Sequence, residues 1–402
     1  MFVLNTTMVV SGLLDGLIAI AILCLGSPST ADGATTNGSR RRWPIQLPDA
    51  VVAGLAGGAA LSVKLLIFRF FGLDLFGLIR LTYFDCVVVL PLVGTAVLIH
   101  RAVRPAGATG PGATLGVTAI AMLTLLAAPL GYYASFIEPF DLRTERPEVT
   151  LTALPPETEP IVVAVLADIQ SPTVDDHVRE AIDAVVNAEP DLIVIPGDIY
   201  EMSQTGPVPE HVADFRAQFS RLHAPAGVFF VNGDCDHADV LDELLRDTDV
   251  RRLDNEVVDT VCNGVPLRIA GLSLHTHTAA ARAAYRNLAD GPTHAIRIVL
   301  SHRPAAVARC LTEGTRPDLA IAGHTHGGQV CIPGYGPIIT LSALPRENAS
   351  GLSRYEGVPL YVSRGIGYEG GQAPRLRLCC PPEVTLLSLI APATKPPTLA
   401  RR

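Results

Sequence analysis

Long apolar runs dominate the first third of the chain, and shorter apolar runs separated by polar stretches dominate the rest. Four of the long runs are close to the ~20 residues that a helix needs to cross a bilayer. They are Met8–Leu25, Ala50–Phe71, Tyr83–Ile99 and Thr114–Ala134. The pattern therefore predicts about four transmembrane helices within residues 1–136. A signal peptide is the alternative for the first run, although that run has no basic start and no clear small-residue cleavage site.

The basic residues between these runs predict the orientation of the helices. Arg40–Arg42 lie in the first connection, and Arg101 and Arg104 lie in the third. With four helices these two connections face the same side, and basic connections are retained in the cytoplasm. Everything after Ala134 is then expected to be extracytoplasmic. This orientation depends on the second run crossing the membrane, although that run contains Lys64.

From Pro160 onward, strand-like and helix-like segments alternate. Ile161–Ala167 is an apolar run rich in β-branched residues, typical of a buried strand, whereas Asp175–Ala188 has apolar residues at helical spacing. Further strands are expected at Leu192–Ile195, Val228–Val231, Leu267–Leu272, Arg297–Leu300, Leu319–Ala322, Pro359–Ser363 and Val384–Leu389. Further helices are expected at Glu210–Leu222, Ala279–Leu288 and Ala305–Leu311. The sequence predicts an α/β layered domain over residues 160–392, after a linker at 137–159 and before a tail at 393–402.

The composition supports membrane segments and narrows the classes of partner. Hydrophobic residues make up 49% of the chain and charged residues only 17%, which is more apolar than an ordinary soluble enzyme. The net charge of -8 argues against a nucleic-acid partner held by phosphate contacts. None of the eight cysteines has the Cys-x-x-Cys spacing of a structural zinc site. The six cysteines after residue 160 could form disulfides, but their pairing is not readable from the sequence.

Polar side chains of a few types follow five of the predicted strands. They are Asp168 and Gln170, Asp198, Asp234 and Cys235, His302, and His324 and His326. In layered α/β domains, active groups are expected on the loops that follow the strand ends. Mixed carboxylate and imidazole ligands suit zinc, manganese or iron, and two such ions ~3.5–4 Å apart can clamp a phosphoryl group.

The order of these motifs resembles the calcineurin-like metallophosphoesterase superfamily over about Pro160–Ile390. The usual order in that family is Asp-x-His, Gly-Asp, Gly-Asn-His-Asp/Glu, His and Gly-His-x-His. The sequence GHTHGGQV from Gly323 and the stretch Pro333-Gly334-Tyr335-Gly336-Pro337 look like a membrane-associated bacterial branch with N-terminal spans. The resemblance implies an enzyme that hydrolyses phosphoesters, and phosphodiesters in particular, at the membrane surface. It also implies two divalent transition metal ions as cofactors, from manganese, zinc or iron.

The resemblance also assigns roles to the polar residues. One metal ion would be held by Asp168, Asp198 and His326. The other would be held by Asp198, Asp234, His302 and His324, so that Asp198 bridges the two ions. The residues expected to act in catalysis are Asp234, Cys235 and His302.

Three residues depart from the family pattern. Gln170 stands where the family has a histidine ligand, and a neutral amide oxygen is a weaker ligand than imidazole. Asp234 stands where asparagine is usual, so it adds a negative charge. Cys235 replaces a histidine that positions the phosphate or protonates the leaving oxygen, although some phosphodiesterase branches carry cysteine there.

Two other classes of function stay open. Gln170 and Cys235 motivate a degenerate, non-hydrolytic sensor or binding protein. Lys64 and Asp85, both within apolar runs, motivate a membrane scaffold or transporter-like module. If the protein is an enzyme, its substrate is a phosphoester, and the nearby bilayer makes a lipid-linked one a candidate.

Several of these residues also have simpler interpretations. Asp168 and Asp198 could cap helices or turns, and His302 could be a buried core histidine. His237, and the pair His275 and His277, are interpreted as solvent-exposed. Arg364 could reach a phosphate or pair with a carboxylate, and the second alternative is favoured.

Overall fold

The computed structural model describes residues 63–64, 66–70, 72–103, 118–119, 121–202, 206–292 and 294–392. The chain divides into two compact units, Met1–Tyr133 with Gly371–Pro374, and Ala134–Gly370 with Arg375–Arg402. The predicted run Met8–Leu25, most of Ala50–Phe71, the basic residues Arg40–Arg42 and Arg104, and the tail lie outside the described residues.

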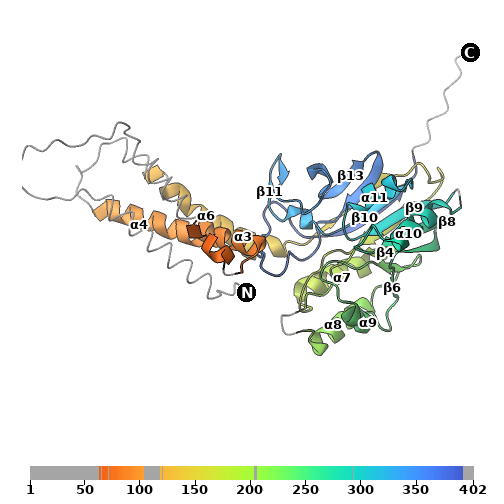
Figure 1. Ribbon diagram of the computed structural model, residues 1–402, viewed down its shortest axis with the longest axis horizontal. Coiled ribbons are helices and arrows are strands. Elements are labelled where there is room, and N and C mark those ends of the chain that lie inside the picture. Colours follow the sequence, from red (N-terminus) through yellow and green to blue (C-terminus); the bar gives the residue numbers. More distant parts are fainter. Residues whose placement is uncertain are drawn as a thin grey trace, which may run out of the picture. The chain divides into compact units, whose positions relative to one another are not determined.

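Apolar helices make up the described part of the first unit. They are α3 (Leu75–Phe84), a π-helical turn (Asp85–Val89), α4 (Leu90–Val103) and α6 (Ala127–Phe136), drawn in orange to gold in Figure 1. The last residues of α6 belong to the second unit. Two stretches of the described chain are long and apolar enough to cross a membrane, Leu75–Ala96 and Ala121–Phe140. The remaining predicted spans fall largely on undescribed residues.

The first of these stretches begins earlier than the predicted run Tyr83–Ile99. Asp74 is the N-cap of α3, and its carboxylate accepts a hydrogen bond of 2.7 Å from the backbone N–H of Gly77. This satisfies a donor at the helix start, where asparagine, aspartate and serine are favoured. The helix therefore includes Arg80, which lies between the predicted runs Ala50–Phe71 and Tyr83–Ile99.

The second unit is built on two β-sheets and a small hairpin. The first sheet has the order β1-β15-β3-β4-β5-β6, with β2 also paired to β15, and the second has the order β13-β14-β10-β9-β8-β7. The first sheet comprises β1 (Arg143–Glu145), β2 (Glu148–Thr150), β3 (Ile161–Val165), β4 (Leu192–Ile195), β5 (Val228–Phe230), β6 (Val250–Arg252) and β15 (Glu383–Ile390). The second comprises β7 (Glu256–Cys262), β8 (Val265–Leu272), β9 (Ile296–Ser301), β10 (Leu319–Ala322), β13 (Gly351–Tyr355) and β14 (Val358–Val362). The hairpin comprises β11 (Cys331–Ile332) and β12 (Gly336–Pro337).

Successive residues of the central strands point to opposite faces, which sorts the core into layers. Val163 and Val165 belong to a cluster shared by both sheets, together with Ile298 and Ile321, so the two sheets pack face to face. Ala164, between the two valines, packs instead in the cluster that joins the first sheet to its helices. These helices are α7 (Asp176–Ala188), α8 (Pro209–Phe219) and α9 (Ala238–Leu244). The second sheet is covered by α10 (Ala279–Ala289) and α11 (Ala306–Thr312) (Figure 1).

The predicted α/β layered fold is confirmed, and the central strands lie within a few residues of their predicted bounds. The main difference is the segment 137–159, which the sequence pattern assigned to a linker. It contains β1 and β2, and both strands pair in parallel with β15. These strands are short and polar, with Arg143 and Glu145 at the ends of β1, so the segment lacked the apolar pattern that identifies a strand.

Candidate metal centre

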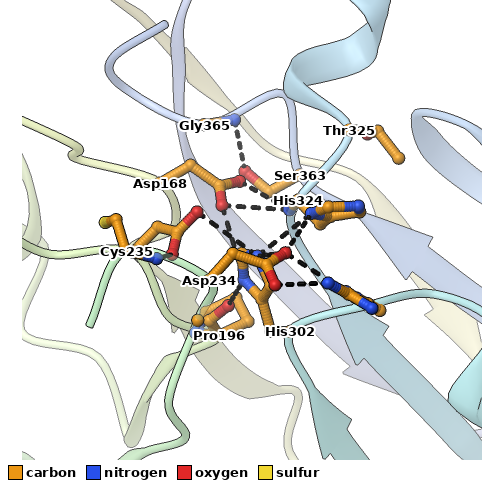
Figure 2. Close-up of polar contacts among 12 residues, drawn as sticks. Asp168, Pro196, Asp234, Cys235, His302, His324, Thr325, Ser363 and Gly365 are labelled. Atoms are coloured by element: carbon orange, nitrogen blue, oxygen red, sulfur yellow. Dashed lines mark hydrogen bonds and ion pairs between the residues drawn. The ribbon is translucent and has the colours of Figure 1, made fainter. Parts of the chain in front are cut away.

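The polar residues at the strand ends meet where the carboxyl edges of the two sheets adjoin. Asp168, Asp198 and Asp234 follow β3, β4 and β5, which are parallel neighbours in the first sheet. His302 and His324 follow β9 and β10, which are parallel neighbours in the second sheet. Figure 2 shows Asp168, Asp234, His302 and His324 converging on one another from these two edges. The fold thus brings three carboxylates of one sheet against two imidazoles of the other.

The distances among these side chains are those of groups that could share cations. His302 Nε2 lies 3.3 Å from Asp198 Oδ2 and 3.4 Å from Asp234 Oδ2, and His324 Nδ1 lies 3.1 Å from the same Asp234 oxygen. The two imidazoles are 3.1 Å apart between His302 Nε2 and His324 Nδ1. Three sets of potential ligand atoms result, namely Asp168 with Asp198 and His302, Asp234 with His302 and His324, and Asp198 with Cys235 and Asp236.

Backbone carbonyls orient both histidines. His302 Nδ1 lies 2.8 Å from the carbonyl oxygen of Pro196, and His324 Nε2 lies 3.1 Å from that of Leu341. A carbonyl oxygen only accepts, so each of these ring nitrogens is the donor, and the opposite nitrogen of each ring faces Asp234. This is the arrangement of a metal-binding imidazole, whose second nitrogen is fixed by a hydrogen bond.

The loops that carry the site residues contain an unusual concentration of left-handed backbone. The φ angles of Asp168, Gln170, Asp198, His324 and His326 are 48°, 39°, 55°, 74° and 47°. Each such residue other than glycine costs of order 1–3 kcal/mol, and such residues cluster at active sites and ligand clamps. All five of these residues belong to the predicted ligand set.

His326 and Gln170 are buried, and their side chains have unpartnered polar atoms. His326 is 1% exposed, and neither of its ring nitrogens has a protein partner. Burial, and then the charge of Arg377, lower the pKa of His326 to about 3, so its imidazole is neutral. Gln170 is 6% exposed, and its Oε1 has no partner. Buried polar atoms are nearly always satisfied, so these atoms fit the role of metal ligands.

The charges of the cluster are strongly coupled. Burial raises the pKa of Asp168, while the carboxylates around His302 outweigh its burial and raise the pKa of that imidazole well above its usual value. Burial opposes the ionisation of Asp234, but hydrogen bonds from His302, His324 and Arg303 hold its pKa far below its usual value. The donor set of carboxylates and imidazoles, with its excess of acids, suits a divalent cation.

Asp236 supports the site, and the sequence analysis did not single it out. Its Oδ2 accepts hydrogen bonds from the backbone N–H groups of Asp198 and Gly233 at 2.8 and 2.7 Å, and its Oδ1 accepts one from Ile199 at 2.9 Å. It therefore ties the loop after β4 to the loop after β5. Its position at the end of the motif Gly233-Asp234-Cys235-Asp236 could have identified it, because the family has Asp or Glu there.

Arg377 is a second supporting residue that the sequence did not reveal. It is fully buried, and its guanidinium donates to backbone carbonyls of five residues. Those residues are His326, Arg364, Gly365, Gly367 and Cys380. Arg377 therefore joins the turn that carries His326 to the loop after β14.

The remaining candidates take up simpler positions. Cys235 is half-buried, its backbone N–H donates to Asp198 Oδ1 at 2.8 Å, and burial raises the pKa of its thiol, which stays protonated. His237, His275 and His277 are exposed, as interpreted from the sequence. Arg364 pairs with Glu145 at 2.6 Å and with Glu383 at 2.7 Å, so the carboxylate interpretation is confirmed.

Comparison with known proteins agrees with this geometry. The calcineurin-like phosphoesterase family matches residues 161–328, which include every predicted site residue. A Bacillus subtilis protein described as uncharacterized metallophosphoesterase YkuE is 27% identical over 66% of this chain and 91% of its own length. A bovine transmembrane protein with a metallophosphoesterase domain is 32% identical over 61% of this chain and 56% of its own. Escherichia coli phosphodiesterase YaeI is 37% identical over 23% of this chain and 32% of its own.

The share of each relative's own length that matches this chain differs. The chain spans about half the length of several relatives, including metallophosphoesterases of Helicobacter pylori and Campylobacter jejuni. The transmembrane relative and the two apolar helices of this chain together indicate that it associates with a membrane. The matched segment, the strand-end residues and the two sheets all point to one conclusion: the chain carries a calcineurin-like metallophosphoesterase domain and is a metal-dependent phosphoester hydrolase.

Proposed function

We propose that the domain hydrolyses phosphodiesters at the membrane surface with two divalent transition metal ions. The observation that carries this proposal is the pair of buried, unpartnered groups, His326 and Gln170, beside the cluster of three carboxylates and two imidazoles. Three unpartnered atoms at predicted ligand positions are costly in a folded protein unless a ligand satisfies them.

The proposed ligand sets follow the resemblance and fit the donors present. Asp168, Gln170, Asp198 and His326 would hold one ion, and Asp198, Asp234, His302 and His324 would hold the other. When bound, such a pair of ions lowers the pKa of a water molecule and offsets charge on the phosphoryl oxygens. The donors of the first set include the neutral amide of Gln170, so this ion is expected to be the more weakly bound.

The protein's own side chains favour a substrate with little negative charge. Asp234 stands in the position where the family has asparagine, and its side chain is 34% exposed. A phosphodiester carries one negative charge and a phosphomonoester close to two, so an added carboxylate repels the monoester more. Arg303 contacts Asp234 and offsets part of this charge. The relative named phosphodiesterase supports the same preference.

The test is hydrolysis of an aryl phosphodiester and an aryl phosphomonoester by the full chain in detergent, with metal content measured on the same sample. We expect turnover of the diester that depends on added manganese or zinc and is lost with a chelator. Faster hydrolysis of the monoester would refute the diester preference. Stoichiometric metal without turnover of either compound would support the non-hydrolytic sensor instead.

Replacing Gln170 with His is expected to raise metal occupancy, because imidazole binds zinc and manganese more strongly than an amide oxygen does. Turnover should rise with occupancy. The measurement is metal per chain after dialysis against a fixed concentration of zinc or of manganese. Gln218→His, near the C-terminal end of α8, is the matched control and should leave metal occupancy and turnover unchanged. Unchanged occupancy in Gln170→His would mean that residue 170 does not face the metal.

We also propose that the catalytic domain is extracytoplasmic, as the basic connections at Arg40–Arg42 and at Arg101 and Arg104 predict. A reporter that is active only outside the cytoplasm, fused after Ile390, should give a signal. A second reporter, active only in the cytoplasm and fused at the same place, should be silent. The reverse result would place the domain inside and direct the search for substrates to cytoplasmic phosphoesters.

A further inference from the structure

Two cysteine thiols lie together behind the turn that carries His326. Cys331 Sγ donates to the carbonyl oxygen of Gly327 at 3.3 Å, and Cys380 Sγ contacts the same oxygen at 3.5 Å. Cys380 Sγ also donates to the carbonyl oxygen of His326 at 3.3 Å. Two sulfur atoms therefore converge on one carbonyl group.

The backbone holds these cysteines side by side. The N–H of Cys331 donates to the carbonyl oxygen of Leu378 at 2.9 Å, and the N–H of Leu378 donates to that of Gln329 at 2.8 Å. These bonds form a parallel bridge between Val330 and Leu378. Sulfur atoms on two adjacent, hydrogen-bonded segments can approach each other without a large movement of the backbone, which is what a disulfide requires.

We propose that Cys331 and Cys380 form a disulfide that fixes the His326 turn, and that Cys379 takes no part in it. Cys331 is half-buried and Cys380 is buried, whereas the neighbouring Cys379 is exposed and has a left-handed backbone with φ 54°. A Cβ atom on Gly327 would lie 2.7 Å from Cys380 Sγ, so the turn rests directly on this sulfur. The cross-link would join the chain just after His326 to the chain just after Arg377.

The oxidant is a second disulfide, either of a small molecule or of a thiol oxidoreductase. One of the two cysteines, as its thiolate, attacks one oxidant sulfur, which forms a mixed disulfide and releases one thiolate. The thiolate of the other cysteine then attacks the protein sulfur of this mixed disulfide, which closes the protein disulfide and releases the second thiolate. The two protons lost by the cysteines are taken up by the two released thiolates. The protein loses two electrons, and the oxidant gains them.

The test is disulfide mapping on the full chain in detergent. Reduced protein is incubated with glutathione disulfide, free thiols are blocked with N-ethylmaleimide under denaturing conditions, and the proteolytic fragments are weighed with and without reduction. A linked pair containing residues 331 and 380 is expected in the wild type and in Cys379→Ser, the matched control. It should be absent from Cys331→Ser and Cys380→Ser.

A second readout separates this cross-link from other pairings and does not depend on activity. Reduction should lower the melting temperature of the oxidised wild type and of Cys379→Ser, because the cross-link restricts the unfolded chain. The proposal fails if both thiols of the wild type take up the blocking reagent after oxidation. It also fails if Cys379 is found as the partner of either cysteine, or if reduction leaves the melting temperature of the wild type unchanged.

Discussion

Replacing Asp198 with Asn is expected to remove most bound metal and to lower turnover by at least ~100-fold. That figure is the upper end of the loss caused by mutating groups that only support a metal ligand, and a bridging ligand should cost more. The amide keeps an oxygen at the position that accepts the N–H of Cys235, so the loop after β4 retains this hydrogen bond. The substitution therefore removes the negative charge while leaving the local backbone supported.

The measurements are metal per chain and kcat/KM on an aryl phosphodiester. The matched control is Asp214→Asn, on the exposed side of α8, which should retain both metal and turnover. Full metal content with normal turnover in Asp198→Asn would show that the carboxylate does not bridge two ions. Normal metal content with lost turnover would instead give Asp198 a role in the reaction without a role in binding.

Arg377→Met is expected to have the largest effect on stability, with a loss of at least ~3 kcal/mol. Methionine fills much of the same volume, but it cannot donate to the five carbonyl groups that the guanidinium satisfies. Leaving even one buried polar group unpaired costs about 1–3 kcal/mol. For a domain of this size the expected fall in melting temperature is about 2–4 °C per kcal/mol, so a fall of at least ~6 °C is expected.

The control for this substitution is two residues away in sequence. Arg375 is exposed and stacks on the ring of Tyr368, with its guanidinium carbon 5.4 Å from the ring centre. Arg375→Met should lower the melting temperature by much less. Because Arg377 also binds the carbonyl of His326, metal retention should fall in Arg377→Met even at temperatures where the domain is folded. Equal melting temperatures for the two variants would contradict the network described for Arg377.

The convergence of the candidate site residues could be predicted because they follow strands that are easy to recognise. Ile193 and its neighbours in β4, or Ala320 in β10, lie in short, continuous apolar runs, and the polar residue that ends each run is conspicuous. Parallel neighbours present such ends along one edge, so the convergence of Asp168 with Asp198, and of His302 with His324, could be anticipated. The residue types then restricted the chemistry to metal binding.

The supporting residues that the sequence did not reveal act through contacts with residues far away in the sequence or with backbone groups. Arg377 appears in the sequence as one arginine among several in a polar loop, and its importance comes from carbonyls as far away as residue 326. Asp236 acts on backbone N–H groups, which leave no trace in side-chain patterns. The strand β7 alternates buried and exposed residues only partly, and β1 has no apolar residue at all, so periodicity could not identify them.

The position of β15 has a consequence for how the domain forms on the ribosome. This last strand lies between β3, its antiparallel neighbour, and the early strands β1 and β2. Until Glu383–Ile390 has been synthesised, β3 has an open edge, and β1 and β2 have no strand to join. Open edges of apolar strands are templates for pairing with other chains. A nascent chain halted before Glu383 therefore has all of the predicted metal ligands but an unprotected sheet edge, so translation has to reach β15 before that edge is protected from pairing with other chains.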